Sequence, residues 1–215
     1  MKHFKNFKTC VYCTAQTLAS LDETTLARDY AYLEKYVGID KVYLETYRDG
    51  TWVAIDHMKM IQNFFKEHGV EIAGGITAVT PPLEKDDAKR QRLFQTFCYS
   101  NETMRTYLKK IVTYTAELFD EIILDDFFFT SCTCDDCLRE RSNLSWAEFR
   151  SNKMIDVAEN LVLKPAKLAN PSVKVTIKYP NWRESYHETG YVPKIQPSMF
   201  DKIYTGTETR NTAHT

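Results

Sequence analysis

The fold is indicated most sharply by the segment Glu121-Ile122-Ile123-Leu124-Asp125-Asp126-Phe127-Phe128-Phe129. It has the pattern of an apolar strand that ends in two adjacent carboxylates, followed by three aromatic residues. Polar residues directly after an apolar strand suit a parallel α/β fold, in which reactive groups gather at the carboxyl ends of the strands.

Short β-rich segments alternate with longer helical patterns along the whole chain. Strands are predicted at 9–14, 41–46, 70–77, 121–126, 173–178 and 202–207. Helices are predicted at 22–37, 56–68, 101–118 and 145–169. The last helix begins at a capping box, Ser145-Trp146-Ala147-Glu148, and a kink is expected at Pro165. This alternation predicts β/α units on a parallel sheet, on the scale of a (β/α)8 TIM-barrel type of α/β fold.

Six β/α units are readable, so we expect a single domain, residues 1–215, of the TIM-barrel type, truncated after about six units. An open doubly wound sheet is the alternative, but it often carries a glycine-rich phosphate turn after its first strand. The residues at that position, Thr14-Ala15-Gln16-Thr17, are unlike such a turn. The segment 78–100 is too long for a simple connection, which predicts either a site-building insertion or a solvated surface loop.

Composition limits the classes of partner. The 215 residues are 43% hydrophobic and 27% charged, as in globular proteins, and their net charge is −1. This balance argues against nucleic acid or an anionic membrane as partner. No apolar run has the length of a membrane span, and none follows the start as in a signal peptide. We expect a soluble protein, either cytoplasmic with reduced thiols or exported with its signal removed, and its oligomeric state stays open.

Four carboxylates are the candidate catalytic groups. Asp125 and Asp126 end the strand at 121–126, Glu208 ends the strand at 202–207, and Glu45 ends the strand at 41–46. Glycosidic bond hydrolysis requires such a pair, one carboxyl to protonate the leaving oxygen and another to act as nucleophile or activate water. Strand alternation predicts that at most one of the two aspartates faces the barrel mouth. The alternative is that both aspartates only cap the loop and bind a cation, Lys178 or Arg48.

Other polar and aromatic residues near the predicted strand ends are candidates for substrate binding. Hydrogen bonding to substrate is expected of Arg48 and Lys178, and the apolar faces of Tyr47, Phe128, Tyr179 and Trp182 offer stacking surfaces for a sugar ring. Asn181 and Arg210 complete the candidate set. Each of these aromatic side chains has the alternative of simply covering the core.

Three cysteines lie within six residues, in Cys132-Thr133-Cys134-Asp135-Asp136-Cys137. Tetrahedral zinc takes four ligands, and Cys98 is the candidate for the fourth, because its loop neighbours this one on the same face. A site closed by four thiolates would be structural, so catalysis itself needs no cofactor. A disulfide and a set of reduced thiols are the alternatives. Cys10 and Cys13 have CxxC spacing on a strand and are expected in the core.

The sequence lacks the patterns of other hydrolases. Its five histidines show neither HxH nor HExxH spacing, and no G-x-S-x-G element is present. A catalytic zinc hydrolase or a serine hydrolase is therefore not expected.

The segment 118–129, Leu118-Phe119-Asp120 followed by the strand quoted above, resembles the strand-four signature of glycoside-hydrolase-like (β/α)8 barrels. The resemblance implies a retaining or inverting glycosidase that acts on an oligo- or polysaccharide, with the strand-four carboxylate in the catalytic pair. Glu45 and Glu208 fit such a barrel less specifically, and the cysteine cluster is not a general feature of it. A non-catalytic carbohydrate-binding barrel is the competing class.

Overall fold

A computed structural model describes residues 4–80, 92–180 and 185–206 of the chain. Within them a single seven-stranded sheet runs in the order β1-β2-β4-β5-β6-β7, with β3 paired to β2. The strands are β1 (Cys10–Cys13), β2 (Lys41–Arg48), β3 (Thr51–Trp52), β4 (Glu71–Ile76), β5 (Glu121–Leu124), β6 (Lys174–Tyr179) and β7 (Lys202–Thr205). All neighbours on this path are parallel, and only the β2–β3 pair is antiparallel.

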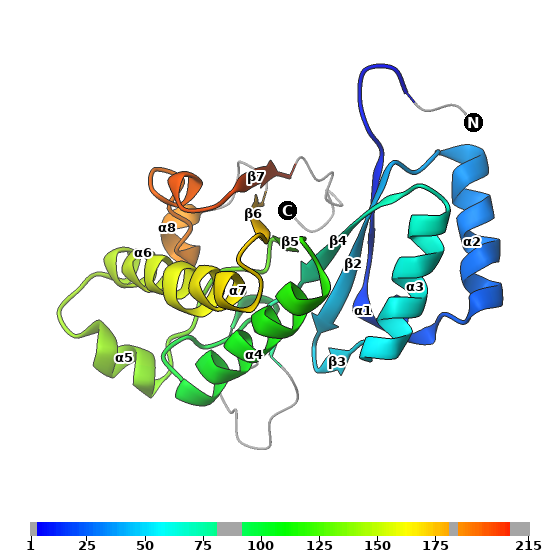
Figure 1. The fold of residues 1–215 in the computed structure, drawn as a ribbon. Helices are drawn as coiled ribbons and strands as arrows, with labels where there is room; N and C mark the ends of the chain where they lie inside the picture. Colours follow the sequence, from blue (N-terminus) through cyan, green and yellow to red (C-terminus); the bar gives the residue numbers. More distant parts are fainter. Residues whose placement is uncertain (1–3, 81–91, 181–184, 207–215) are drawn as a thin grey trace, which may run out of the picture.

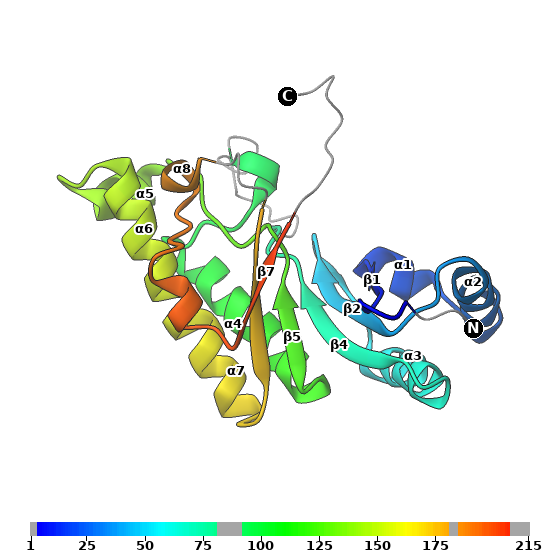
Figure 2. The ribbon, with the colours of Figure 1, turned by 90° about the horizontal axis from the view of Figure 1, so that it is seen from above.

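Helices connect the strands and cover one face of the sheet, which Figure 2 shows curling as part of a barrel. They are α1 (Ala15–Ser20), α2 (Glu23–Tyr36), α3 (Ile55–Glu67), α4 (Glu102–Leu118), α5 (Asp135–Arg141), α6 (Trp146–Val157), η3 (Ala158–Leu163), α7 (Lys164–Ala169) and α8 (Tyr186–Thr189), together with the short turns η2 (Leu93–Gln95) and η4 (Gln196–Ser198). Figure 1 shows α3, α4 and α7 packed along the strands. No described helix has both the length and the apolar content needed to cross a membrane.

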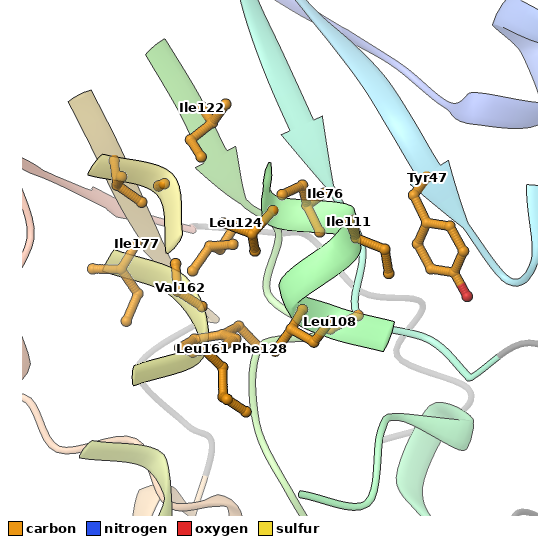
Figure 3. Packing of buried hydrophobic residues seen from close by; sticks show 14 of the residues in the cluster. Tyr47, Ile76, Leu108, Ile111, Ile122, Leu124, Phe128, Leu161, Val162 and Ile177 are labelled. Atoms are coloured by element: carbon orange, nitrogen blue, oxygen red, sulfur yellow. The ribbon is translucent and has the colours of Figure 1, made fainter. Parts of the chain in front are cut away.

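The two faces of the sheet bury different side chains. On the helix side, the apolar residues of the strands meet those of α4 and η3 in the main core (Figure 3). The labelled side chains there include Ile122, Leu124, Ile177, Leu108, Ile111, Leu161 and Val162. On the inner side, Tyr43, Ala73 and Ile123 form a separate small cluster with Tyr12 against it. Strand alternation thus directs every second residue into the barrel interior.

Gly75 lies on this inner face under the ring of Tyr12. A Cβ atom at Gly75 would stand 2.7 Å from the Tyr12 hydroxyl oxygen, closer than real Cβ contacts allow. The missing side chain lets the Tyr12 hydroxyl reach Glu45 Oε1 at 2.7 Å. Glycine at this position therefore fixes the geometry next to the carboxyl ends of the strands.

The predicted strands and long helices are all present, and several short elements were not predicted. The additional elements are α1, β3, α5 and α8 together with the short turns. The capping box at Ser145 begins α6 as predicted. Irregularity in the long helix begins before Pro165, because the segment η3 is π-helical. Cys10 is exposed at the edge strand rather than buried, so its assignment to the core was wrong, while Cys13 is half-buried.

Candidate active site

A cleft of about 660 Å³ lies at the carboxyl ends of β5 and β6. Its polar lining residues are Asp125, Asp126, Ser131, Arg150, Lys178, Ser185, Glu188 and Thr189. Its aromatic lining residues are Phe94, Phe127, Phe129 and Tyr191. Concave, largely apolar sites with a few convergent polar groups at strand carboxyl ends are the usual ligand sites of α/β folds.

Asp125 directly follows β5 and is 8% exposed. Its carboxylate accepts from Lys178 Nζ at 3.0 Å and from Arg48 Nη2 at 3.1 Å. The Thr77 hydroxyl lies at 3.3 Å. Burial alone would raise the pKa of Asp125, but the neighbouring Lys178, a backbone hydrogen bond and Arg48 lower it below its ordinary value. Asp125 is therefore ionised at neutral pH.

Asp126 contacts the same ammonium group, with Lys178 Nζ at 3.5 Å from its carboxylate. Both aspartates line the cleft, so the prediction that at most one of them faces the mouth is wrong. The physical reason is that β5 ends at Leu124 and the chain turns immediately after it, so strand alternation no longer applies. The binding of Asp125 to Lys178 and Arg48 also matches the salt-bridge alternative, but these contacts leave both aspartates in the cleft.

Glu45 is completely buried and does not line the cleft. Its carboxylate accepts from the Tyr12 hydroxyl at 2.7 Å, from the Ala15 backbone N–H at 2.7 Å and from Arg48 Nε at 2.9 Å. The Thr77 hydroxyl donates to the same carboxylate. Since Arg48 and Thr77 also contact Asp125, Glu45 holds the two groups that hold Asp125. In this geometry the Glu45 carboxylate has no exposed surface toward the cleft.

The predicted sugar-stacking residues lie elsewhere. Tyr47 has no exposed surface, and its hydroxyl donates to the Val79 carbonyl at 2.9 Å in the helix-side core. Phe128 and Tyr179 are also buried and are absent from the lining of the cleft. None of these three offers a free ring face. The turn after β5 instead turns the neighbours Phe127 and Phe129 toward the cleft.

Four predicted site residues, Asn181, Trp182, Glu208 and Arg210, lie outside the described residues. Of the other predicted substrate-binding residues, Lys178 lines the cleft and Arg48 lies behind Asp125. The Arg48 guanidinium also stands 5.6 Å from the Phe127 ring centroid.

Sequence reasoning missed Phe94, Arg150, Glu188 and Tyr191. Phe94 belongs to the segment 78–100, and its φ of 51° is rare for a bulky residue. The Leu93 N–H donates to the Ser131 hydroxyl at 2.8 Å, which ties this segment to the loop after β5. The described part of the segment therefore builds one side of the cleft. Arg150 belongs to a helix whose sequence carries no signal that it reaches a strand end.

The four predicted cysteine ligands come together beside the cleft. The sulfur of Cys98 lies 3.6 Å from the sulfurs of both Cys134 and Cys137, and these two are 3.8 Å apart. All four sulfurs, including that of Cys132, lie within 4.8 Å of one another. Four sulfurs bound to zinc at about 2.3 Å in a tetrahedron would be about 3.8 Å apart, so the cluster fits a metal ion.

The thiols are free of disulfides and differ in acidity. All six cysteines of the chain are unpaired. Hydrogen bonds with the Cys137 and Cys98 thiols lower the pKa of Cys132, which favours its thiolate. The same sharing of protons raises the pKa of Cys98. A cluster of thiols that stabilises a thiolate is a ready metal ligand set, because metal binding requires deprotonated sulfur.

Solved structures with a similar fold are barrel glycosidases. A β-galactosidase from the psychrophilic Marinomonas ef1 matches with a TM-score of 0.66 at 11% identity, over 94% of this chain and 41% of that one. A cold-adapted β-galactosidase from Rahnella sp. R3 matches with a TM-score of 0.67 at 10% identity, over 96% of this chain and 41% of that one. These likenesses confirm the fold, an α/β structure whose curled parallel sheet corresponds to part of a TIM barrel.

The family follows from the sequence as a whole. A family model described as probable glycosyl hydrolase, catalytic domain, matches residues 1–215. An uncharacterized protein of Saccharolobus solfataricus is 34% identical over 96% of this chain and 38% of its own length. The chain belongs to this family of probable glycosyl hydrolase catalytic domains, and the resemblance seen in the strand-four segment is confirmed. The chain spans well under half the length of this relative and of the two solved structures.

Proposed function

We propose that the cleft hydrolyses glycosidic bonds of an oligo- or polysaccharide by a two-carboxylate mechanism. The observation that supports this most is the pair of adjacent carboxylates, Asp125 and Asp126, which line an aromatic cleft at the carboxyl ends of β5 and β6. Membership of a glycosyl hydrolase family supports the same reaction class.

The geometry favours different roles for the carboxylates. Asp125 is ionised because Lys178 and Arg48 lower its pKa, so it suits a nucleophile, a base or a group that stabilises an oxocarbenium-like transition state. The leaving-group oxygen must instead be protonated by a carboxylic acid with a raised pKa. We assign this role to Glu208, because the Lys178 ammonium beside Asp126 favours the ionised form of that carboxylate. Lys178, which contacts both aspartates, keeps Asp125 ionised while substrate binds.

The salt bridges of Asp125 also favour one competing function, carbohydrate binding without hydrolysis. In that case Asp125 and Lys178 would only accept from and donate to sugar hydroxyls. Binding and hydrolysis of the same sugar must therefore be measured side by side.

The test is the rate of hydrolysis of a panel of 4-nitrophenyl glycosides and oligosaccharides by the wild-type protein, Asp125→Asn and Asp126→Asn. Glu121→Gln serves as the control, because Glu121 begins β5 and is not part of the cleft lining. We expect Asp125→Asn to lower kcat about 10³-fold and to leave sugar affinity within about threefold. Equal rates for the wild-type protein and both aspartate variants contradict the two-carboxylate mechanism. Sugar binding without hydrolysis by the wild-type protein supports the competing function.

We also propose that the Cys98, Cys132, Cys134 and Cys137 cluster holds a structural zinc ion. The sulfur separations support tetrahedral coordination, and a set of four thiolates leaves no open position for water. Bound metal would tie the Cys98 loop to the loop after β5 and so stabilise one side of the cleft. It takes no part in bond cleavage.

Elemental analysis of the purified protein tests this site. We expect about one zinc per chain, lost in Cys98→Ser and Cys137→Ser together with a lower Tm. Cys10→Ser and Cys13→Ser are matched controls, because these two cysteines lie outside the cluster. Wild-type protein that folds with four reduced thiols and no metal rules the proposal out.

A further inference from the structure

Arg150 is a cation in the cleft that the proposed reaction does not use. It lies on α6, is half-buried and lines the same cleft as Asp125 and Lys178. Its Nε is buried without a hydrogen-bond partner, and its guanidinium makes no salt bridge with any described residue. Within the described part of the chain, the guanidinium stands 4.9 Å from the centroid of the Trp146 ring.

This state is unusual among the basic groups around the cleft. Lys178 contacts two carboxylates, and Arg48 contacts Asp125 and Glu45. A partly buried cation without an ionic partner costs free energy, unless a ligand supplies the missing negative charge. Arg150 therefore has donors to offer to a molecule that enters the cleft.

The backbone at Arg150 is packed closely against Gly190. Glycine is needed at Gly190, because a Cβ there would stand 2.7 Å from the Arg150 carbonyl oxygen. The end of α8, directly before Gly190, is tied to the loop after β5 by the Thr130 N–H, which donates to the Thr189 carbonyl at 3.0 Å. Ser131 and Thr189 line the cleft as well. Arg150 thus lies at a polar end of the cleft, on a closely packed stretch of backbone.

Neither the nearby Glu188 carboxylate nor the thiols of Cys132 and Cys137 pair with the Arg150 guanidinium. Glu188 lines the cleft but is exposed and forms no salt bridge with Arg150. The thiols of Cys132 and Cys137 act on Arg150 only through space, as does Glu188. If the cysteine cluster binds zinc through four thiolates, its net charge is negative, and Arg150 could stabilise that charge instead of binding a ligand. The experiment below distinguishes these two roles.

We propose that Arg150 binds a carboxylate of the substrate, so that the cleft accepts an acidic glycoside containing a hexuronic acid. This inference rests on the proposed glycosidase function for the identity of the ligand as a sugar. A planar guanidinium pairs with a carboxylate through two parallel hydrogen bonds, which a neutral sugar hydroxyl does not reproduce. The substrate carboxylate would lie at the Arg150 end of the cleft, with the scissile bond toward Asp125 and Asp126.

The test compares matched pairs of ligands at constant ionic strength. The probes are 4-nitrophenyl glucuronide against glucoside and 4-nitrophenyl galacturonide against galactoside, with dissociation constants measured by ligand-observed NMR. Asp125→Asn is the background, so that binding is read without turnover. We expect the acidic member of at least one pair to bind at least 10-fold more tightly. Arg150→Gln should weaken that binding about 10- to 100-fold and change neutral-sugar binding less than threefold.

Arg141→Gln is the matched control. Arg141 also stands 4.9 Å from the Trp146 ring centroid, but it does not appear in the cleft lining. We expect the Arg141 variant to retain the preference for the acidic sugar. The metal content and Tm of both variants are measured, because a role restricted to the cysteine cluster would lower these and leave sugar preference unchanged.

Several results overturn the inference. They are equal binding of the acidic and neutral members of both pairs, an equal loss from both arginine variants, and tighter binding of galactose 6-sulfate than of galacturonate. Failure of the proposed function is distinct from these. If the protein binds a uronide selectively but the wild-type protein does not cleave it, the proposed anion site stands and the proposed hydrolysis is wrong. If the protein cleaves only neutral glycosides and Arg150→Gln does not affect this, the proposed hydrolysis stands and the proposed anion site is wrong.

Discussion

The two ends of the barrel interior carry similar ion pairs but different surroundings. At the amino end, Glu121 lies between Lys41 and Lys202, each with its Nζ 2.6 Å from the carboxylate. At the carboxyl end, Asp125 lies between Lys178 and Arg48 at 3.0 and 3.1 Å. Burial would raise the pKa of both carboxylates, and in both the cations reverse this and lower it. Of these two carboxylates, Asp125 lines the aromatic cleft and Glu121 does not.

This comparison shows that a paired, ionised carboxylate does not by itself mark a site. Glu121 and Asp125 stand at opposite ends of the same short strand, so one set of backbone hydrogen bonds positions both. What distinguishes Asp125 is the concave, aromatic space beside it and its place at the carboxyl end, where loops rather than strand starts meet.

The largest expected effect comes from removing one lysine at each end, Lys178→Met and Lys202→Met. We expect Lys178→Met to lower kcat about 10²- to 10³-fold, because it removes the cation shared by both aspartates. Since Lys178 lowers the pKa of Asp125, its loss should also move the acidic limb of the pH–rate profile to higher pH. Lys202→Met should leave kcat within about twofold. Initial rates across acidic and neutral pH check both, and similar losses in the two variants would remove the distinction between the ends.

The next effect concerns the network behind Asp125. Glu45→Gln should lower the free energy of unfolding by about 3 kcal/mol, because an amide N–H₂ then faces donors that a buried carboxylate accepted. Urea unfolding measures this. The control is Glu71→Gln at the exposed Lys8–Glu71 pair, which should change stability much less. If Glu45 instead touches substrate, Glu45→Gln will abolish activity in protein whose stability is unchanged.

The amino end should respond to pH rather than to substrate. The lowered pKa of Glu121 means that its charge stabilises the folded protein above the unfolded-state pKa. This contribution is lost as pH falls through the folded-state pKa. Glu121→Gln should therefore cost about 2 kcal/mol at neutral pH, and its difference from wild type should shrink in acid. Unfolding curves at several pH values check this, and a difference that is constant with pH would contradict the ion-pair account.

Much of the fold was predictable because it rests on local periodicity. The apolar strand before Asp125 and the capping box at Ser145 are both read correctly from the sequence. The four-cysteine cluster was predictable from spacing together with the rule that neighbouring loops share a face.

The orientation of the site residues was much less predictable. Alternation fails one residue past Leu124, where a turn places both aspartates in the cleft and Phe128 in the core. Tyr47 was predicted to stack on a sugar ring, but it is buried on the helix side of the sheet. The register between β2 and β4 shifts between Glu45 and Tyr47, which simple strand alternation does not predict. Arg150 lies on α6, which packs against α8, and this tertiary contact has no local signal in the sequence.

The smallest expected effect separates two lysines that bind one carboxylate. Lys41 and Lys202 have the same 2.6 Å distance to Glu121, but their side chains are 11% and 47% exposed. Lys41→Met leaves a buried carboxylate less compensated and should cost about 2 kcal/mol, whereas Lys202→Met should cost less than about 1 kcal/mol, because water screens the exposed ammonium. Urea unfolding at low and high salt measures both. If the two variants lose the same stability, distance rather than burial governs these pairs, and the same would then hold for Lys178 and Arg48 at the carboxyl end.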